Sequence, residues 1–196
     1  MTRPEGGVPG PESYRDAGPR IYAASLSDYN AGVLHGVWLE AAEPVEQLHE
    51  AIGEMLAESP TTHRYGDVAE EWAIHDYEGF GSHLRIEEFD SLDRVHLLAA
   101  RIAEHGEAFG AWQANQGDDD EAEQFEDHFA GEFSSAEDYG EHLLDEMGFD
   151  PADLPEVPES LRLYISVDVA GWVRDMQLGG EIFMVESPRG VYVFWQ

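Results

Sequence analysis

Residues 102–161 read IAEHGEAFGAWQANQGDDDEAEQFEDHFAGEFSSAEDYGEHLLDEMGFDPADLPEVPESL. This stretch holds nineteen acidic residues and neither lysine nor arginine. Large apolar residues stand between the acids, among them Phe109, Trp112, Phe125, Tyr139 and Leu143. A plain acidic tail has few aromatic residues and stays disordered, so the apolar residues here predict a folded core. The stretch therefore predicts a folded surface of almost purely negative charge.

The whole chain shares this bias. Its 196 residues carry a formal net charge of −32, from 42 acids against ten arginines, and there is no lysine. Nucleic acid and anionic membranes repel such a charge, whereas a strongly basic partner is attracted and steered. The chain has no cysteine, which excludes disulfides and thiolate ligands. No apolar run approaches the roughly 18 residues of a membrane span, and no secretory signal is recognisable, so we expect a cytoplasmic protein.

The amount of charge also bears on the expected shape. Duplex DNA carries about one charge per 1.7 Å of axis, so a charge of −32 corresponds to roughly 54 Å of duplex. A single compact domain of this length would be only about 42 Å across. A row of small domains could display the charge at a density like that of DNA, so we expect an elongated chain of three small sections.

Residues 1–19 are rich in Pro and Gly and have no apolar periodicity, which predicts a disordered tail. An N-terminal α+β domain is expected at 20–84. Within this domain the apolar pattern predicts three strands, one turn, one helix and one loop. The elements are expected at 20–26 (strand), 27–32 (turn), 33–40 (strand), 45–57 (helix), 58–66 (loop) and 71–78 (strand).

Residues 85–120 are expected to form a central helical domain. Ser91 can cap a helix that ends at Gly106, and a second short helix carries Phe109 and Trp112 and ends by Gly117.

Residues 121–196 are expected to form a C-terminal α+β domain, which makes the fold class α+β. Residues 118–130 suit a helix or, equally, a strand near their end. Ser135 opens a helix that Gly148 closes, and prolines place turns at 151–158. Residues 160–178 read as mostly helical, and 181–186 with 191–196 read as a hairpin.

Signals for catalysis or metal binding are weak. No histidine pair has the HExxH spacing of a zinc site. The run from Asp118 to Glu123 resembles a calcium loop, but Glu123 replaces the glycine of position six, and Phe129 stands at position twelve instead of glutamate. A lysine-free chain cannot hold a Walker lysine, and there is no G-x-S-x-G elbow. We therefore expect no enzyme activity and no cofactor.

Several segments together resemble the ArdA family of antirestriction proteins. The resemblance spans residues 20–196, and its middle, 82–135, matches only in acidic and helical character. The lysine-free composition and the tail at 1–19 depart from the family pattern. The matching positions are Ile21, Tyr22, Ala24, Leu26, Tyr29, Asn30, Gly32, Leu34, Gly36, Trp38, the run Glu70 to Glu78, the run Val157 to Leu161, Tyr164, Ile165, Gly171, Arg174, Asp175 and the closing hairpin.

The resemblance implies an elongated homodimer whose carboxylates imitate the phosphates of bent B-form DNA. Such a protein occupies the DNA-binding groove of type I restriction–modification enzymes and protects incoming mobile DNA. Dimerisation then belongs to residues 121–196. His75, Asp76 and Tyr77 match the family pattern, and we expect them to hold the third strand.

The acids expected to bind the partner lie in the central section and directly after it, and their effect should be collective. They are Glu87, Glu88, Asp90, Glu104, Glu107, Asp118, Asp119, Asp120, Glu121, Glu123, Glu126 and Asp127.

Two other classes of function fit the composition. One is a general acidic decoy that binds many basic DNA-binding proteins. The other is a halophilic enzyme whose acidity only serves solvation and which needs molar salt to fold.

Overall fold

The computed structural model describes residues 18–66, 68–116, 122, 124–150, 158–162 and 164–196. The fold is α+β, with two three-stranded antiparallel sheets. The chain divides into two compact units, at 1–119 and 120–196. Residues 85–119 thus share a unit with the first sheet, and their separation as a central domain stays a prediction. Most of the expected tail, the acids 118–121 and 123, and the expected turns at 151–157 lie outside the described residues. Among the described helices, none is both long and apolar enough to cross a membrane.

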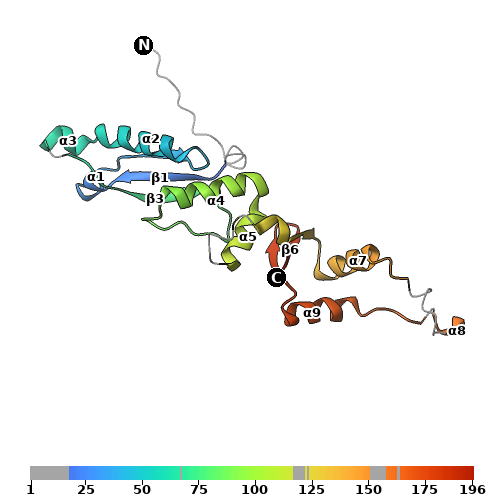
Figure 1. The fold of residues 1–196 in the computed structure, drawn as a ribbon. Coiled ribbons are helices and arrows are strands. Elements are labelled where there is room, and N and C mark those ends of the chain that lie inside the picture. Colours follow the sequence, from blue (N-terminus) through green and yellow to red (C-terminus); the bar gives the residue numbers. More distant parts are fainter. Residues whose placement is uncertain (1–17, 67, 117–121, 123, 151–157, 163) are drawn as a thin grey trace, which may run out of the picture. The chain divides into compact units, whose positions relative to one another are not determined.

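The first unit is built on a sheet of strand order β2-β1-β3 (Figure 1). Its elements in chain order are β1 (Arg20–Ser25), α1 (Leu26–Asn30), β2 (Gly36–Glu40), α2 (Val45–Ala57), α3 (Pro60–Tyr65), β3 (Trp72–Glu78), α4 (Leu92–His105) and α5 (Glu107–Gln116).

The core of this unit lies between the sheet and its long helices. Ile21 of β1 pairs with Leu39 of β2, and both side chains are buried. Helix α2 runs alongside β1 and β2 and buries Leu48 and Ile52 (Figure 1). Helix α4 packs against α2 and α5, and α5 contributes the fully buried Trp112. Burying these large apolar side chains is the main stabilising term of the unit.

The second unit holds a sheet of strand order β4-β6-β5. Its elements in chain order are α6 (Phe125–His128), β4 (Phe129–Phe133), α7 (Ala136–Glu146), α8 (Glu159–Arg162), α9 (Val169–Gly179), β5 (Ile182–Ser187) and β6 (Gly190–Trp195).

Two layers of apolar residues hold this second unit together. Tyr139 of α7, Val173 of α9 and Val193 of β6 belong to one buried cluster, in which α7 and α9 also pack against each other. A separate set of rings stacks across the strands. Phe183 and Phe194 have ring centroids 4.8 Å apart, which is the offset arrangement that aromatic pairs favour.

The main expected helices and strands are confirmed. The helix at 45–57 has the expected bounds, and Ser91 caps α4, which ends at Gly106. Ser135 caps α7, and β5 with β6 forms the closing hairpin.

Three local predictions in the first unit were wrong. Residues 26–30 form helix α1, because the Ser25 hydroxyl accepts from the Asp28 N–H and caps it. The expected loop at 58–66 contains α3, and the strand expected from Val33 begins at Gly36.

The expected helix over 160–178 is divided into α8 and α9. Asp168 caps α9, since its Oδ1 accepts from the Gly171 N–H at 2.9 Å. Of the 118–130 segment, only 125–128 is α-helical among its described residues, and β4 follows directly.

Candidate partner-binding surface

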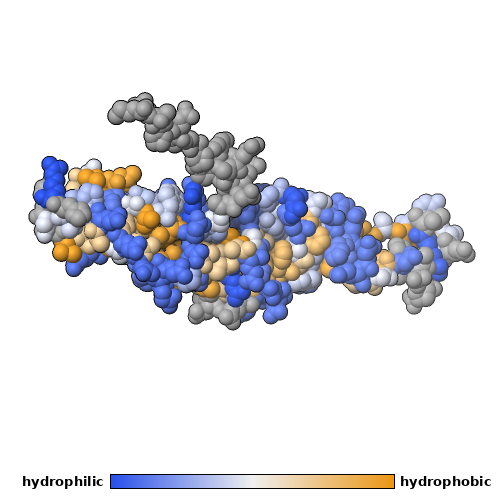
Figure 2. Space-filling view, turned by 90° about the horizontal axis from the view of Figure 1, so that it is seen from above, coloured by the Kyte–Doolittle hydropathy of each residue, from blue (hydrophilic) through white to orange (hydrophobic). Residues whose placement is uncertain are grey.

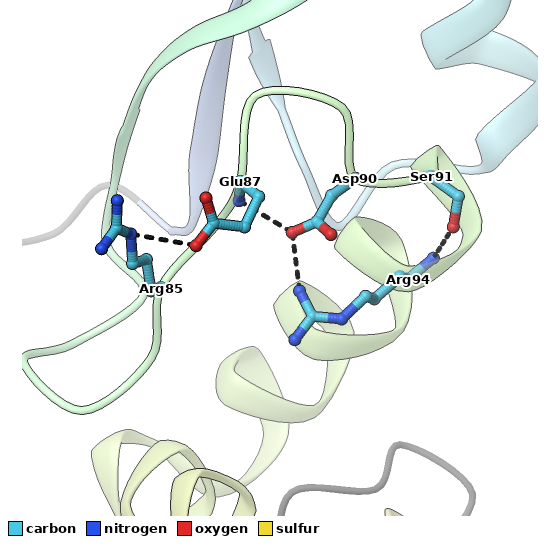
Figure 3. Close-up of polar contacts among 5 residues, drawn as sticks. All are labelled: Arg85, Glu87, Asp90, Ser91 and Arg94. Atoms are coloured by element: carbon cyan, nitrogen blue, oxygen red, sulfur yellow. Dashed lines mark hydrogen bonds and ion pairs between the residues drawn. The ribbon is translucent and has the colours of Figure 1, made fainter.

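The loop that leads into α4 carries three of the expected partner-binding acids. The Ile74 N–H of β3 donates to the Glu88 carbonyl oxygen at 2.9 Å, which ties the loop to the sheet. Asp90 Oδ2 accepts from the Glu87 N–H at 2.9 Å and from Arg94 Nη1 at 2.7 Å (Figure 3). Ser91 Oγ accepts from the Arg94 N–H and begins the helix. Asp90 therefore closes the loop onto the first turn of α4.

The carboxylates of this loop differ in how much charge they present. The side chain of Asp90 is only 17% exposed and is already paired with Arg94. Glu87 is exposed and lies 3.0 Å from Arg85 Nε, a surface pair of little energetic weight (Figure 3). Glu88 is exposed as well. Glu87 and Glu88 can thus meet a partner, whereas Asp90 mainly stabilises the loop.

The remaining expected acids fall on both units. Glu104 is exposed at the end of α4, and Arg101 Nη1 approaches it at 3.4 Å. Glu107 is exposed in the first turn of α5, where the helix dipole favours a negative charge. Glu126 and Asp127 are exposed on α6 of the second unit. Asp118, Asp119, Asp120, Glu121 and Glu123 lie outside the described residues.

A row of acids on α2 was missed by the sequence reasoning. Glu46, Glu50 and Glu54 are four residues apart and exposed, and Glu58 continues the row at the end of the helix. Residues at this spacing lie on one helix face, and Leu48 and Ile52 are buried on the other side. The rise of 1.5 Å per residue places one carboxylate about every 6 Å. The four-residue spacing of the acids could have predicted this row, but a search for apolar periodicity does not detect it.

Helix α7 of the second unit carries a row of the same kind. Glu137, Glu141 and Asp145 are exposed at four-residue spacing, while Tyr139 and Gly140 are buried. Like charges at this spacing repel and destabilise a helix by a few tenths of a kcal/mol per pair. Neither row is explained by the stability of its helix.

Some acids are structural instead. Asp138 Oδ2 accepts from the N–H and the hydroxyl of Ser134, both at 2.9 Å, and these bonds lower the pKa of Asp138. Glu132 bonds Arg189 of the hairpin turn, and this bond lowers the pKa of the Glu132 carboxyl. These hydrogen bonds join neighbouring parts of the second unit, so the two acids stabilise its fold.

Asp28 is the extreme case of a structural acid. Its side chain is fully buried, and its Oδ1 accepts from the Thr61 N–H at 2.9 Å, which joins α1 to α3. Burial alone would raise the pKa of Asp28. Hydrogen bonds from Ser25, Ser59 and Thr61 outweigh burial and hold the pKa of this carboxyl well below its usual range.

Comparison with known proteins assigns the chain to a family. The family model described as antirestriction protein (ArdA) matches residues 21–190, which is most of the chain. No curated protein matches the chain. The matched range begins in β1 and ends at the turn between β5 and β6, so the match covers both compact units. The chain therefore belongs to the ArdA family of antirestriction proteins.

Proposed function

We propose that this protein is a non-enzymatic mimic of B-form DNA. Its carboxylates take the place of DNA phosphates in the DNA-binding groove of type I restriction–modification enzymes, and so protect incoming mobile DNA. The family membership supports an antirestriction role, and the net charge of −32 supports a basic groove as the target. The mechanism is competition for the groove and needs no cofactor.

The row on α2 is the single observation that carries this proposal. One strand of duplex DNA has a charge about every 3.4 Å of axis, and Glu46, Glu50 and Glu54 offer a charge about every 6 Å. The row thus has somewhat more than half the linear charge density of one DNA strand. No arginine or lysine lies within α2, so nothing on this helix neutralises the row. The acids Glu87, Glu88, Glu104 and Glu107 are also exposed on the same unit.

The second unit has its own share in the proposed surface. It carries the α7 row and, on α6, the exposed acids Glu126 and Asp127. The acids 118–121 and 123 stay part of the proposal on grounds of sequence alone. We also propose a cytoplasmic homodimer, joined through residues 121–196, as the family resemblance implies.

Competition with DNA tests the mechanism. A purified type I restriction–modification enzyme is bound to labelled DNA that holds its target, and this protein is titrated at low and at moderate salt. We expect displacement at near-stoichiometric amounts that weakens with salt, because salt screens the charges and competes for the groove. A folded sample that displaces no DNA would contradict the proposal for that enzyme. If the protein displaced DNA equally well from unrelated DNA-binding proteins, the result would favour the general acidic decoy.

Neutralising the α2 row tests its part directly. The variant E46Q/E50Q/E54Q should raise the concentration for half-displacement about tenfold, if each exposed charge contributes roughly 0.5 kcal/mol to binding. Its melting temperature should rise by up to a few degrees, because repulsion along the helix is relieved. Weaker inhibition together with higher stability excludes unfolding as the cause.

The matched control keeps the charge and changes the side chain. E46D/E50D/E54D should retain most of the displacement activity, since the proposed effect depends on charge. If the Asp and Gln variants lost activity equally, the α2 row would act through side-chain shape and not as a phosphate mimic.

A further inference from the structure

The outer face of the first sheet contains an open hollow of about 480 Å³. Tyr22 of β1 pairs with Trp38 of β2 on one side and with Asp76 of β3 on the other. These three residues, with Leu34 and His75, line the hollow. The solvated face of an antiparallel sheet is usually polar. Here Leu34 is 74% exposed and Trp38 is 38% exposed. Figure 2 shows one face of the molecule, on which apolar residues lie among many hydrophilic ones.

Two backbone features build the hollow. Tyr22 lies opposite Asp76 and Ala23 lies opposite Ile74, so His75 is an extra residue without an opposite partner. Such a β-bulge breaks the alternation of side chains, and His75 and Asp76 both line the hollow although they are consecutive. The Tyr29 ring meets the His75 ring edge to face, with centroids 4.6 Å apart.

Glycine at position 36 is the second feature. A Cβ atom there would lie 2.5 Å from the Ala23 carbonyl oxygen and 2.7 Å from Tyr22 Cζ. Only glycine therefore lets the Tyr22 ring lie over β2 at this point. The ring centroids of Tyr22 and Trp38 are 5.4 Å apart, so the two rings form one wall of the hollow.

On the same sheet face, the guanidinium of Arg20 already lies beside an aromatic ring and a carboxylate, as an arginine in the hollow would. Arg20 Cζ lies 4.8 Å from the centre of the Trp38 ring, and Arg20 Nε donates to Glu78 Oε2 at 2.9 Å. Tyr22 and Asp76 form the neighbouring pair on the same two strands, one side-chain repeat or about 7 Å from Arg20 and Glu78. The hollow thus offers aromatic rings and a carboxylate, and none of its five lining residues is an arginine or a lysine.

We infer that this hollow receives an arginine side chain of the bound protein. The exposed Asp76 carboxylate supplies the complementary charge, and the Tyr22 ring supplies the aromatic face. The Trp38 ring already carries Arg20 of the same chain and forms the neighbouring wall. Arginine stacks on aromatic rings better than lysine, because its guanidinium is planar and more weakly hydrated. The inference rests on the proposed function, since it takes the arginine from the basic groove. It adds to the acidic rows one site that selects the kind of cation.

A peptide titration tests the hollow without any restriction enzyme. The peptides acetyl-Gly-Arg-Gly-amide and acetyl-Gly-Lys-Gly-amide are titrated while the indole N–H signals of the five tryptophans are followed by NMR. Trp38→Phe assigns the signal of interest. We expect the arginine peptide to shift the Trp38 signal saturably and to bind about two- to fivefold more tightly than the lysine peptide.

Matched variants connect the hollow to inhibition. Asp76→Asn should weaken arginine-peptide binding about two- to fivefold and raise the half-displacement concentration by a similar factor. Glu43→Gln removes the same charge from an exposed position outside the hollow and should change neither by that much.

The outcomes separate the two proposals. Equal binding of both peptides, shifts spread over all tryptophans, or equal effects of Asp76→Asn and Glu43→Gln would overturn the arginine site. Failure of the wild-type protein to displace DNA would instead overturn the DNA mimic, and the peptide titration would still decide the hollow.

Discussion

Asp28 and Glu50 carry the same carboxylate group and serve this protein in opposite ways. Asp28 is fully buried, and the Thr61 N–H binds it, so it joins two short helices. Glu50 is exposed in a row of like charges that weakens its own helix. Among 42 acids, the distinction between the two roles comes from hydrogen-bonding partners and burial, which composition does not reveal.

Asp28→Asn should destabilise the protein by about 1–3 kcal/mol at neutral pH, because the hydrogen bonds around Asp28 favour its charged form. The pKa of Asp28 is lower in the folded than in the unfolded state. Its stabilising contribution is therefore fully present above the unfolded pKa of about 3.9 and is lost as the pH falls below that value. Urea unfolding followed by tryptophan fluorescence measures the difference.

The pH dependence is the control for this prediction. The gap between wild type and Asp28→Asn should be large near pH 6 and smaller near pH 3. A gap of unchanged size at both pH values would show that lost packing, and not the charged carboxylate, causes the destabilisation.

Elements with a local signal were predictable. The apolar spacing of Leu48, Ile52 and Met55 fixes α2, and the cap at Ser91 fixes the start of α4. Helix α3 was missed because PTTHRY has no apolar periodicity, although Ser59 as cap and Pro60 at the first position were a readable signal.

Strand β4 depends on partners far along the chain. Phe129 pairs with Phe194 and Phe133 pairs with Val191, more than fifty residues away. Phe125, Phe129 and Phe133 are four apart and equally suit a helix, so their local pattern cannot decide between helix and strand. Pairing with β6 selects the strand, which is why the bounds of α6 and β4 were not predictable.

The exposure of the candidate acids was predictable in part, and which of them bind a partner stays a prediction. Acidity and helical content indicated the central section, and Glu87, Glu88 and Glu107 are indeed exposed. Asp90 is half-buried because Arg94 lies one helical turn further on, and a list of acids does not show such a pair.

The contact between α7 and α9 depends on Gly140. A Cβ atom there would lie 2.4 Å from Val169 Cγ1 and 2.6 Å from Val173 Cγ2. Gly140→Ala should therefore destabilise the protein by about 1–3 kcal/mol, although alanine favours a helix more than glycine does. Urea unfolding measures the effect.

Gly53 is the matched control within α2. Apart from the backbone of its own helix and its chain neighbours, no atom lies within 4 Å of a Cβ built there, so Gly53→Ala should stabilise the protein by up to about 1 kcal/mol. Equal effects of the two substitutions would contradict the close packing of α7 on α9.

At the scale of the whole molecule, the net charge of −32 should make stability depend on salt. Raising NaCl from about 20 mM to about 300 mM shortens the Debye length from roughly 20 Å to roughly 6 Å. We expect the melting temperature to rise by several degrees and then level off, as followed by circular dichroism.

The variant E46Q/E50Q/E54Q should gain less from salt than the wild type, because it has fewer repelling charges. A chain that showed no cooperative unfolding transition below molar salt would instead support the halophilic reading of the composition.

The division into two compact units has a consequence for the lifetime of the proposed complex. Each unit has its own sheet and its own acid row, and the chain joins the two covalently. Once one unit is bound, the other is held near the enzyme at a high effective concentration, which is the condition for avidity. Two individually weak, fast-exchanging contacts then give slow dissociation of the protein from the enzyme, because both units must dissociate at the same time.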